Sequence, residues 1–159
     1  MQLKNIFSII KKYYEQNYNM QYIQQVKLKM YKKIIADYLR SRIQDLRAVI
    51  IFGSFANNSE NRYSDIDIAF LSSKKISNIQ RWKLQEELAS ILDKDVDLVD
   101  LESASDVFKF QIASGGIVIY ADSSKDIELY LDKIYTIYLQ LNDDRKAILE
   151  DIRNGVYYV

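Results

Sequence analysis

Four short apolar runs constrain the fold of this chain more than any other feature of its sequence. They are rich in β-branched residues, are bounded by polar or glycine-containing segments, and cover residues 48–52, 65–71, 95–101 and 117–121. Runs of this length and composition are typical of strands in a buried sheet. Helix-like segments accompany them, so the sequence predicts a small mixed β-sheet flanked by helices, an α/β or α+β domain.

The helical segments are recognised by their spacing and by their first residues. One face of an early helix is expected to carry four residues at helical spacing: Val26, Met30, Ile34 and Tyr38. The region before Met20 is predicted to form another helix, and residues 104–114 a later one. Capping boxes at Ser77 and Ser123 predict the starts of two more. Residues 143–154 offer a final, separate helix.

A chain of 159 residues has the size of one domain, so we expect a single domain over residues 1–159. Residues 1–30 would form a helical N-terminal extension, and residues 123–155 the C-terminal helices. The first 33 residues contain seven lysines against one acidic residue, Glu15. We interpret this segment as a solvated helix face, with a docking surface for an acidic partner or an RNA as the alternative, and do not expect direct nucleic-acid binding.

The chain contains neither cysteine nor histidine. Disulfides, thiolate zinc sites and imidazole ligands are therefore excluded, and carboxylates remain as metal ligands and proton acceptors near neutral pH. The apolar run near the N-terminus, residues 6–10, is too short for a signal peptide or a membrane-spanning helix. We therefore expect a cytoplasmic protein that makes no contact with a membrane.

The candidate site combines a Gly-Ser turn with three aspartates. Gly53 and Ser54 directly follow a strand, at a turn that can start a short helix, where backbone N–H groups and a hydroxyl can receive a phosphate. Asp65 and Asp67 follow after ten residues, and alternation along a strand puts both carboxylates on one face. Asp97 can project beside them if its strand is a neighbour. Such a carboxylate set favours Mg²⁺ and, with two cations bound, a nucleoside triphosphate.

This order of Gly-Ser, ten residues and Asp-x-Asp resembles the signature of the nucleotidyltransferase superfamily related to DNA polymerase β. Asp97 stands in the place of the third acidic residue of that superfamily. The short chain and the sequence Ser64-Asp65-Ile66-Asp67 look most like the minimal nucleotidyltransferases, the MntA-type antitoxins that are partnered with HEPN-type RNases. The resemblance extends over residues 35–153.

The resemblance implies the polymerase β-like palm fold and a metal-dependent transferase that moves AMP from ATP to a tyrosine of a HEPN-type toxin, in a type VII-like toxin–antitoxin pair. It implies that Asp65, Asp67 and Asp97 are catalytic and hold two Mg²⁺ ions, with Mn²⁺ as a possible substitute. The residues that it implies for nucleotide binding are Gly53, Ser54, Arg62 and Ser64. A homo- or hetero-oligomer is compatible with this function.

The chain departs from the family pattern at Asn57-Asn58, where many relatives have a basic residue and a glycine. Arg62, or Lys74 and Lys75, could supply the missing positive charge. Two other functions stay open at this point. The chain could be a non-catalytic antitoxin that binds its partner through the basic, tyrosine-rich N-terminal segment, or it could transfer a nucleotide to a small molecule such as an aminoglycoside.

Overall fold

The computed structural model describes Ile9, Lys12, residues 20–57, Ser59 and residues 64–154. In chain order its elements are α2 Met20–Arg42, β1 Leu46–Phe52, the 3₁₀ turn η1 Gly53–Phe55, β2 Ile66–Ser72, α3 Asn78–Leu92, β3 Val96–Asp100, α4 Asp106–Gly115, β4 Ile117–Ala121 and α5 Ser124–Arg153. All four predicted strands are present, with ends that differ from the expected ones by at most two residues.

The four strands form one mixed sheet in the order β3-β2-β1-β4. β1 runs antiparallel to both of its neighbours, β2 and β4. β2 and β3 are parallel, and α3 is the crossover that connects them, as a parallel pair requires. The predicted fold class, a small mixed sheet flanked by helices, is therefore confirmed.

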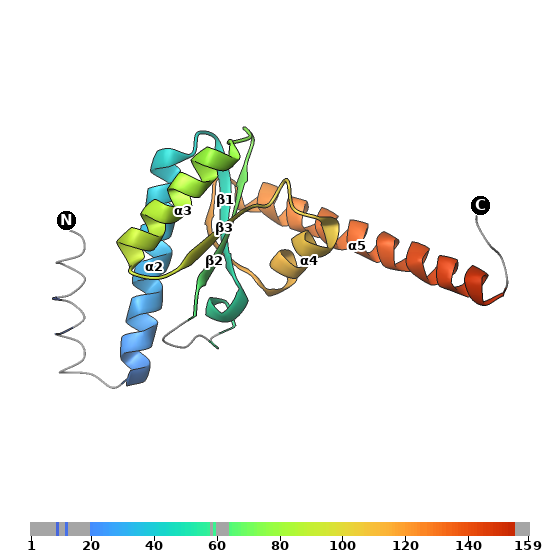
Figure 1. Cartoon of the computed structure of the whole chain (residues 1–159), viewed down its shortest axis with the longest axis horizontal. Helices are drawn as coiled ribbons and strands as arrows, with labels where there is room; N and C mark the ends of the chain where they lie inside the picture. The colour runs from blue at the N-terminus through green and yellow to red at the C-terminus, as the bar shows by residue number, and fades with distance from the viewer. Residues whose placement is uncertain (1–8, 10–11, 13–19, 58, 60–63, 155–159) are drawn as a thin grey trace.

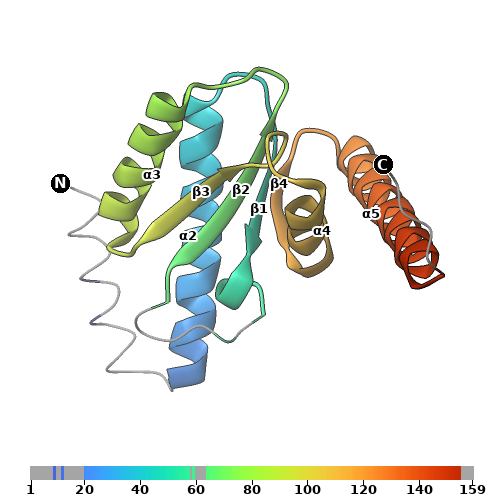
Figure 2. The same cartoon turned by 45° about the vertical axis from the view of Figure 1, so that its right-hand side comes forward.

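Helices cover both faces of the sheet (Figures 1 and 2), with α2 and α3 on one face and α4 and α5 on the other. The main core lies under α2 and α3, where Ile51, Ile68 and Leu98 pack against Ile35 of α2 and Leu88 of α3. A smaller core on the opposite face is formed by Ile50, Ala69, Leu101 and Ile112. The sheet therefore has no broad face that lacks a helix.

The buried face of α2 differs from the predicted one by one position. Ile23, Tyr31, Ile35 and Leu39 are buried, whereas the predicted stripe of Val26, Met30, Ile34 and Tyr38 is only half-buried. Tyr31, Ile35 and Leu39 have the same four-residue spacing as Met30, Ile34 and Tyr38, so periodicity alone cannot choose between these two faces. α2 also runs without a break across residue 30, where the N-terminal extension was expected to end.

The C-terminal segment is one helix, so the separate helix predicted over residues 143–154 is wrong. α5 has 30 residues and no glycine or proline to interrupt it, and the polar run around Asp143 is only mildly unfavourable in a helix. The predicted caps are present: the Ser77 and Ser123 hydroxyls accept backbone N–H groups at 3.1 and 3.4 Å. None of the described helices, long α5 included, is apolar enough to span a bilayer.

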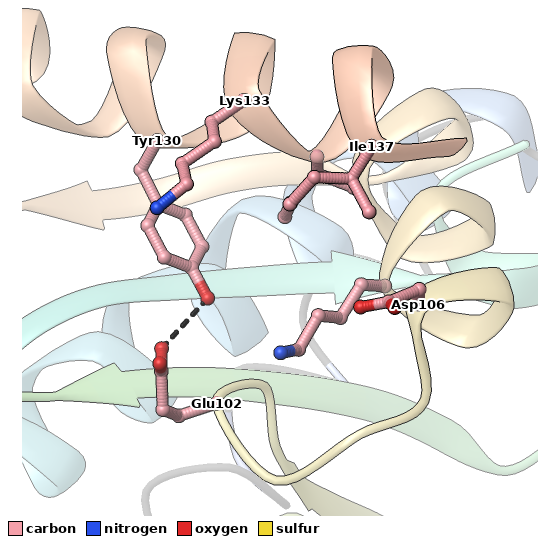
Figure 3. Close-up of a pocket in the computed structure, with 7 residues that line it drawn as sticks. Glu102, Asp106, Tyr130, Lys133 and Ile137 are labelled. Carbon is pink, nitrogen blue, oxygen red and sulfur yellow. Dashed lines mark hydrogen bonds between the residues drawn. The ribbon is translucent and has the colours of Figure 1, made fainter. Parts of the chain in front are cut away.

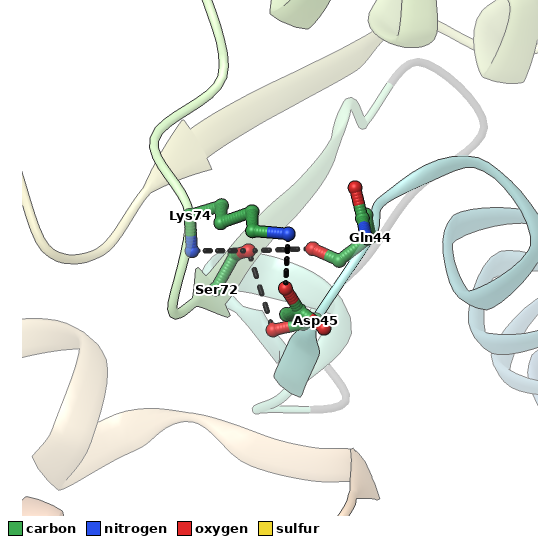
Figure 4. A network of polar contacts seen from close by, with 4 residues as sticks. All are labelled: Gln44, Asp45, Ser72 and Lys74. Atoms are coloured by element: carbon green, nitrogen blue, oxygen red, sulfur yellow. Dashed lines mark hydrogen bonds and ion pairs between the residues drawn. The ribbon is translucent and has the colours of Figure 1, made fainter.

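A polar network fixes the turn before β1 to the end of β2 (Figure 4). The Ser72 hydroxyl donates to the carbonyl oxygens of Gln44 and Asp45, at 3.1 and 3.3 Å. The Lys74 ammonium pairs with the Asp45 carboxylate at 3.0 Å. Lys74 is thus held beyond the end of β2 opposite to Asp67, roughly 20 Å along the strand. It is therefore badly placed to replace the missing basic residue of the Gly-Ser loop.

Candidate active site

The Gly-Ser turn and the second aspartate of the Asp-x-Asp pair are in direct contact. Gly53 has a φ of +67°, in the left-handed region that glycine adopts without strain. A Cβ atom built on Gly53 would lie 2.1 Å from Oδ2 and 3.0 Å from Cγ of Asp67. Only glycine lets the backbone approach the carboxylate this closely, which explains why this residue type stands at the end of β1.

Asp97 lies beside Asp67 because β2 and β3 are parallel neighbours in which these two residues are directly paired. Ile66 and Ile68 of β2 and Leu98 of β3 all point into the main core. Because side chains alternate along a strand, Asp67 and Asp97 point to the opposite face of the sheet. The predicted neighbourhood of the two acidic strands is therefore confirmed. Its role in catalysis stays a prediction.

The charges of the three aspartates act on one another. The pKa of Asp67 is raised, first by burial of the carboxyl and then by the negative charges of Asp97 and Asp65. Asp67 is half-buried, while Asp65 and Asp97 are exposed. Among the residues that the structure describes, no three acidic side chains converge into a ready-made metal cage. The arrangement is thus an open acidic cluster with one partly buried member.

The short helix expected after Gly53 is a single 3₁₀ turn. The N–H groups of Ala56 and Asn57 both donate to the Gly53 carbonyl, at 3.2 and 3.3 Å. This closes the turn immediately next to the acidic cluster. Asn58 and Arg62, which carry the departure from the family pattern and its suggested replacement, lie outside the described residues.

Ser54 and Ser64, the two serines predicted to bind nucleotide, are both half-buried. The backbone carbonyl of Ser64 accepts a hydrogen bond of 3.1 Å from Lys94, whose ammonium lies 5.5 Å from the ring centroid of Phe55. Lys94 therefore joins the segment before Asp65 to η1. Sequence reasoning missed this lysine, because a lysine that follows a helix has the pattern of any surface charge.

Two side chains of α3 hold the outer edge of β3 next to Asp97. Arg81 donates from Nη1 to the Leu98 carbonyl at 2.7 Å, and the Gln85 side-chain oxygen accepts the Leu98 N–H at 3.0 Å. In the described part of the chain β3 is an edge strand, so no described strand lies next to these groups on that side. The four-residue spacing of Arg81 and Gln85, which puts both on one face of α3, is the signal that could have pointed to them.

An aromatic pair stands beside the acidic cluster. Phe52 is the residue of β1 directly paired with Asp67. Its ring packs edge-to-face on that of Phe108 in α4, with 5.8 Å between the centroids. Both rings are half-buried. The cluster therefore has an apolar wall on the β1 side, which the sequence analysis did not identify.

A separate pocket lies between α4 and α5 (Figure 3). Glu102, Asp106, Lys109, Lys133 and Tyr130 contribute to its walls. The Tyr130 hydroxyl donates to Glu102 at 2.8 Å, and burial together with this bond raises the pKa of Tyr130. Glu102 lies two residues after Asp100, the last residue of β3, so this wall of the pocket lies beyond the end of that strand. The pocket does not include the three aspartates.

Comparisons with known proteins agree on one family. The family model for polymerase β nucleotidyltransferases matches residues 32–125. The protein adenylyltransferase MntA of Shewanella oneidensis is 42% identical over 118 residues, which make up 74% of this chain and 84% of the relative. A putative protein adenylyltransferase of Methanocaldococcus jannaschii is 30% identical over 86 residues, 54% of this chain and 89% of the relative.

Solved structures show the same relationship. A crystal structure of a toxin–antitoxin pair with AMP-PNP contains a chain that is 40% identical, with a TM-score of 0.70 over 77% of this chain and 98% of that one. In a complex of tri-AMPylated HEPN toxin and MNT antitoxin from Shewanella oneidensis, the matching chain is 37% identical, with a TM-score of 0.67 over 79% and 98% of the two chains. The chain therefore belongs to the polymerase β nucleotidyltransferase family and, within it, to the minimal, MntA-like nucleotidyltransferases.

Proposed function

We propose that this protein is a cytoplasmic antitoxin that transfers AMP from ATP to a tyrosine of a HEPN-type toxin. The similarity to a protein adenylyltransferase supports this reaction, and the similarity to chains of toxin–antitoxin complexes supports the kind of acceptor. The observation in this chain that carries the proposal is the fit of the Gly53 backbone against the Asp67 carboxylate, with Asp97 paired alongside.

The donor set fits Mg²⁺, with Mn²⁺ as a substitute. Asp65, Asp67 and Asp97 offer only carboxylate oxygens, the ligands that hard cations prefer, and the chain has no histidine or cysteine to favour another metal. Mg²⁺ is usually held by one or two carboxylates together with substrate phosphates, so an open cluster that ATP completes suits it better than a closed cage. When bound, two such ions would neutralise the charge of the triphosphate and polarise the phosphorus that is attacked.

The side chains of the cluster then have distinct roles. Gly53 and Ser54 position the β- and γ-phosphates through backbone N–H groups and the serine hydroxyl. Asp97, exposed at the open side of the cluster, accepts the proton of the acceptor tyrosine, whose ordinary pKa near 10 requires such help at neutral pH. The tyrosine oxygen forms a bond to the α-phosphorus, the bond to the bridging oxygen breaks, and pyrophosphate leaves. Asp65 and Asp67 would hold the cations.

The test uses ATP labelled at the α-phosphate. The full chain is incubated with labelled ATP, Mg²⁺ and the HEPN-type protein encoded beside it, and the label on the partner is measured. We expect transfer by the wild type and its loss in Asp67→Asn and Asp97→Asn. Asp132→Asn, which changes an exposed aspartate of α5 far from the cluster in sequence and on another element, is the matched control and should keep the wild-type rate.

The alternatives predict other results. If neutralisation of the toxin survives Asp67→Asn and Asp97→Asn and no label is transferred by the wild type, the protein acts by binding alone. Transfer of label to an aminoglycoside but not to the protein partner would identify a small-molecule transferase. Either result would overturn the proposed reaction.

A further inference from the structure

The segments of the candidate site meet at one end of the sheet. Phe52, the last residue of β1, is paired with Asp67 near the start of β2. Asp67 is in turn paired with Asp97 near the start of β3. The connection from α3 to β3, residues 93–95, therefore lies at the same end of the sheet as the Gly-Ser turn.

This connection is fixed by its backbone. Asp93 ends α3 in the left-handed conformation, with a φ of 52°, and its N–H and that of Lys94 both donate to the Ala89 carbonyl. The Asp95 carbonyl accepts the N–H of Ile66 at 2.9 Å, where β2 and β3 begin to pair. The side chain of Lys94 therefore starts from a backbone that is held on both sides.

Lys94 links two segments of the site. Its ammonium donates to the Ser64 carbonyl at 3.1 Å, and this carbonyl belongs to the peptide group that precedes Asp65. The same ammonium lies 5.5 Å from the ring centroid of Phe55, within the range of a cation–π contact. Phe55 directly follows Ser54 and is only 3% exposed. One charge thus holds both the Gly-Ser turn and the segment that leads into the Asp-x-Asp pair.

Lys94 contacts the site from the side opposite to its carboxylates. Phe55 belongs to the main core, where its ring also packs edge-to-face on Tyr31 of α2, with 6.3 Å between the centroids. Asp67 and Asp97 point to the other face of the sheet. Lys94 is therefore placed to fix the backbone of the site and not to bind the phosphates of ATP.

We propose that Lys94 is a positioning residue that sets the separation between the Gly-Ser turn and the segment leading into Asp65. A charge-assisted hydrogen bond is stronger than a neutral one, so this contact restrains the Ser64 peptide group more than an uncharged donor would. A shift of a reacting group by about 1 Å lowers a rate by about 10²-fold. The effect of Lys94 on the rate rests on the proposed transfer reaction, whereas the link between the two segments does not.

Hydrogen exchange of the full chain without nucleotide or toxin tests the link. Lys94→Met keeps an apolar stem and removes the ammonium. We expect the N–H groups of Ala56 and Asn57, which close the Gly-Ser turn, to exchange about tenfold faster in this variant. The N–H of Ile127 in α5 should exchange as in the wild type. Lys83→Met makes the same change at an exposed lysine of α3 and, as the matched control, should leave all of these rates unchanged.

Transfer of AMP from α-labelled ATP to the HEPN-type partner tests the consequence for the reaction. Lys94→Met should lower kcat by about tenfold to 10²-fold with little change in the KM for ATP, because the lysine positions reacting groups and does not bind the nucleotide. Lys94→Arg should restore most of the rate, since a guanidinium can donate to the same carbonyl and lie over the same ring. Lys83→Met should keep the wild-type kcat.

The outcomes separate the two proposals. Unchanged exchange at Ala56 and Asn57 in Lys94→Met overturns the link. A Lys94→Met variant that keeps the wild-type kcat, or that only raises KM, overturns the positioning role, and so does a Lys94→Arg variant that is no faster than Lys94→Met. A wild type that transfers no AMP overturns the proposed reaction instead, and the hydrogen exchange then still decides whether Lys94 links the two segments.

Discussion

Replacing Gly53 by alanine tests how closely the Gly-Ser turn and the Asp67 carboxylate are fitted together. The φ of +67° is costly for any residue with a Cβ atom, by roughly 1–2 kcal/mol. The new Cβ would also lie 2.1 Å from Oδ2 of Asp67, so the carboxylate has to rotate away. Such a rotation costs little free energy, but a reacting group misplaced by about 1 Å lowers a rate by about 10²-fold. We therefore expect a modest loss of stability and a much larger loss of activity.

Urea unfolding and AMP transfer from α-labelled ATP measure the two effects separately. For Gly53→Ala the free energy of unfolding should fall by roughly 1–2 kcal/mol, and transfer should fall by about 10²-fold. Gly115→Ala is the matched control, because a Cβ atom at Gly115, the last residue of α4, meets nothing within 4 Å. This variant should lose neither stability nor activity.

Two results would refute this reasoning. One is a Gly53→Ala variant that keeps the full transfer rate, since the displaced carboxylate would then be irrelevant to the reaction. The other comes from the double variant: in a chain that already carries Asp67→Ala, the stability cost of Gly53→Ala should persist, because it arises from the backbone. If the cost disappears there, the contact with the carboxylate, and not φ, determines the stability of the turn.

Three further changes have direct expectations. Burial and two neighbouring acids raise the pKa of Asp67, so this group stabilises the folded state below its ordinary pKa and loses that contribution as the pH rises through the raised pKa. Asp67→Asn should therefore raise the urea midpoint at pH 7 and make the midpoint depend less on pH. An unchanged midpoint would contradict this. Leu88→Ala, in the fully buried core, should cost about 2–5 kcal/mol in urea unfolding, whereas Trp82→Ala on the exposed face of α3 should cost far less. Ser77→Ala removes the cap of α3 and should lower the unfolding free energy by about 1 kcal/mol, measured in the same way.

Local sequence patterns were sufficient for the architecture. Strand composition predicted all four strands. Alternation predicted Asp65 and Asp67 on one face, with Asp97 beside them if its strand was a neighbour, and the pairing of Asp67 with Asp97 confirms that the two strands are neighbours. Periodicity failed on α2, because Tyr31, Ile35 and Leu39 have the same spacing as Met30, Ile34 and Tyr38 and differ from them only in being covered by the domain. The long α5 was divided in two because a polar run resembles a boundary when no breaker is present.

The candidate site shows what sequence patterns cannot supply. Motif spacing identified the Gly-Ser turn and the aspartates, but the contact of Gly53 with the Asp67 carboxylate depends on how two strands are brought together in space. Arg81 and Lys94 were missed for a related reason, since each acts through a backbone carbonyl that is distant in sequence. The assignment of metal and nucleotide ligands, and the single domain over the whole chain, stay predictions.

The hydrogen bonds from α3 to the outer edge of β3 also affect how readily the chain aggregates at high concentration. An open strand edge is a template on which strands of other molecules can add, and this is a common route to aggregation. Arg81 and Gln85 occupy the carbonyl and the N–H of Leu98, the positions that an incoming strand would use. We therefore expect substitutions of Arg81 or Gln85 to cause aggregation into inclusion bodies more often than to give a soluble protein without activity.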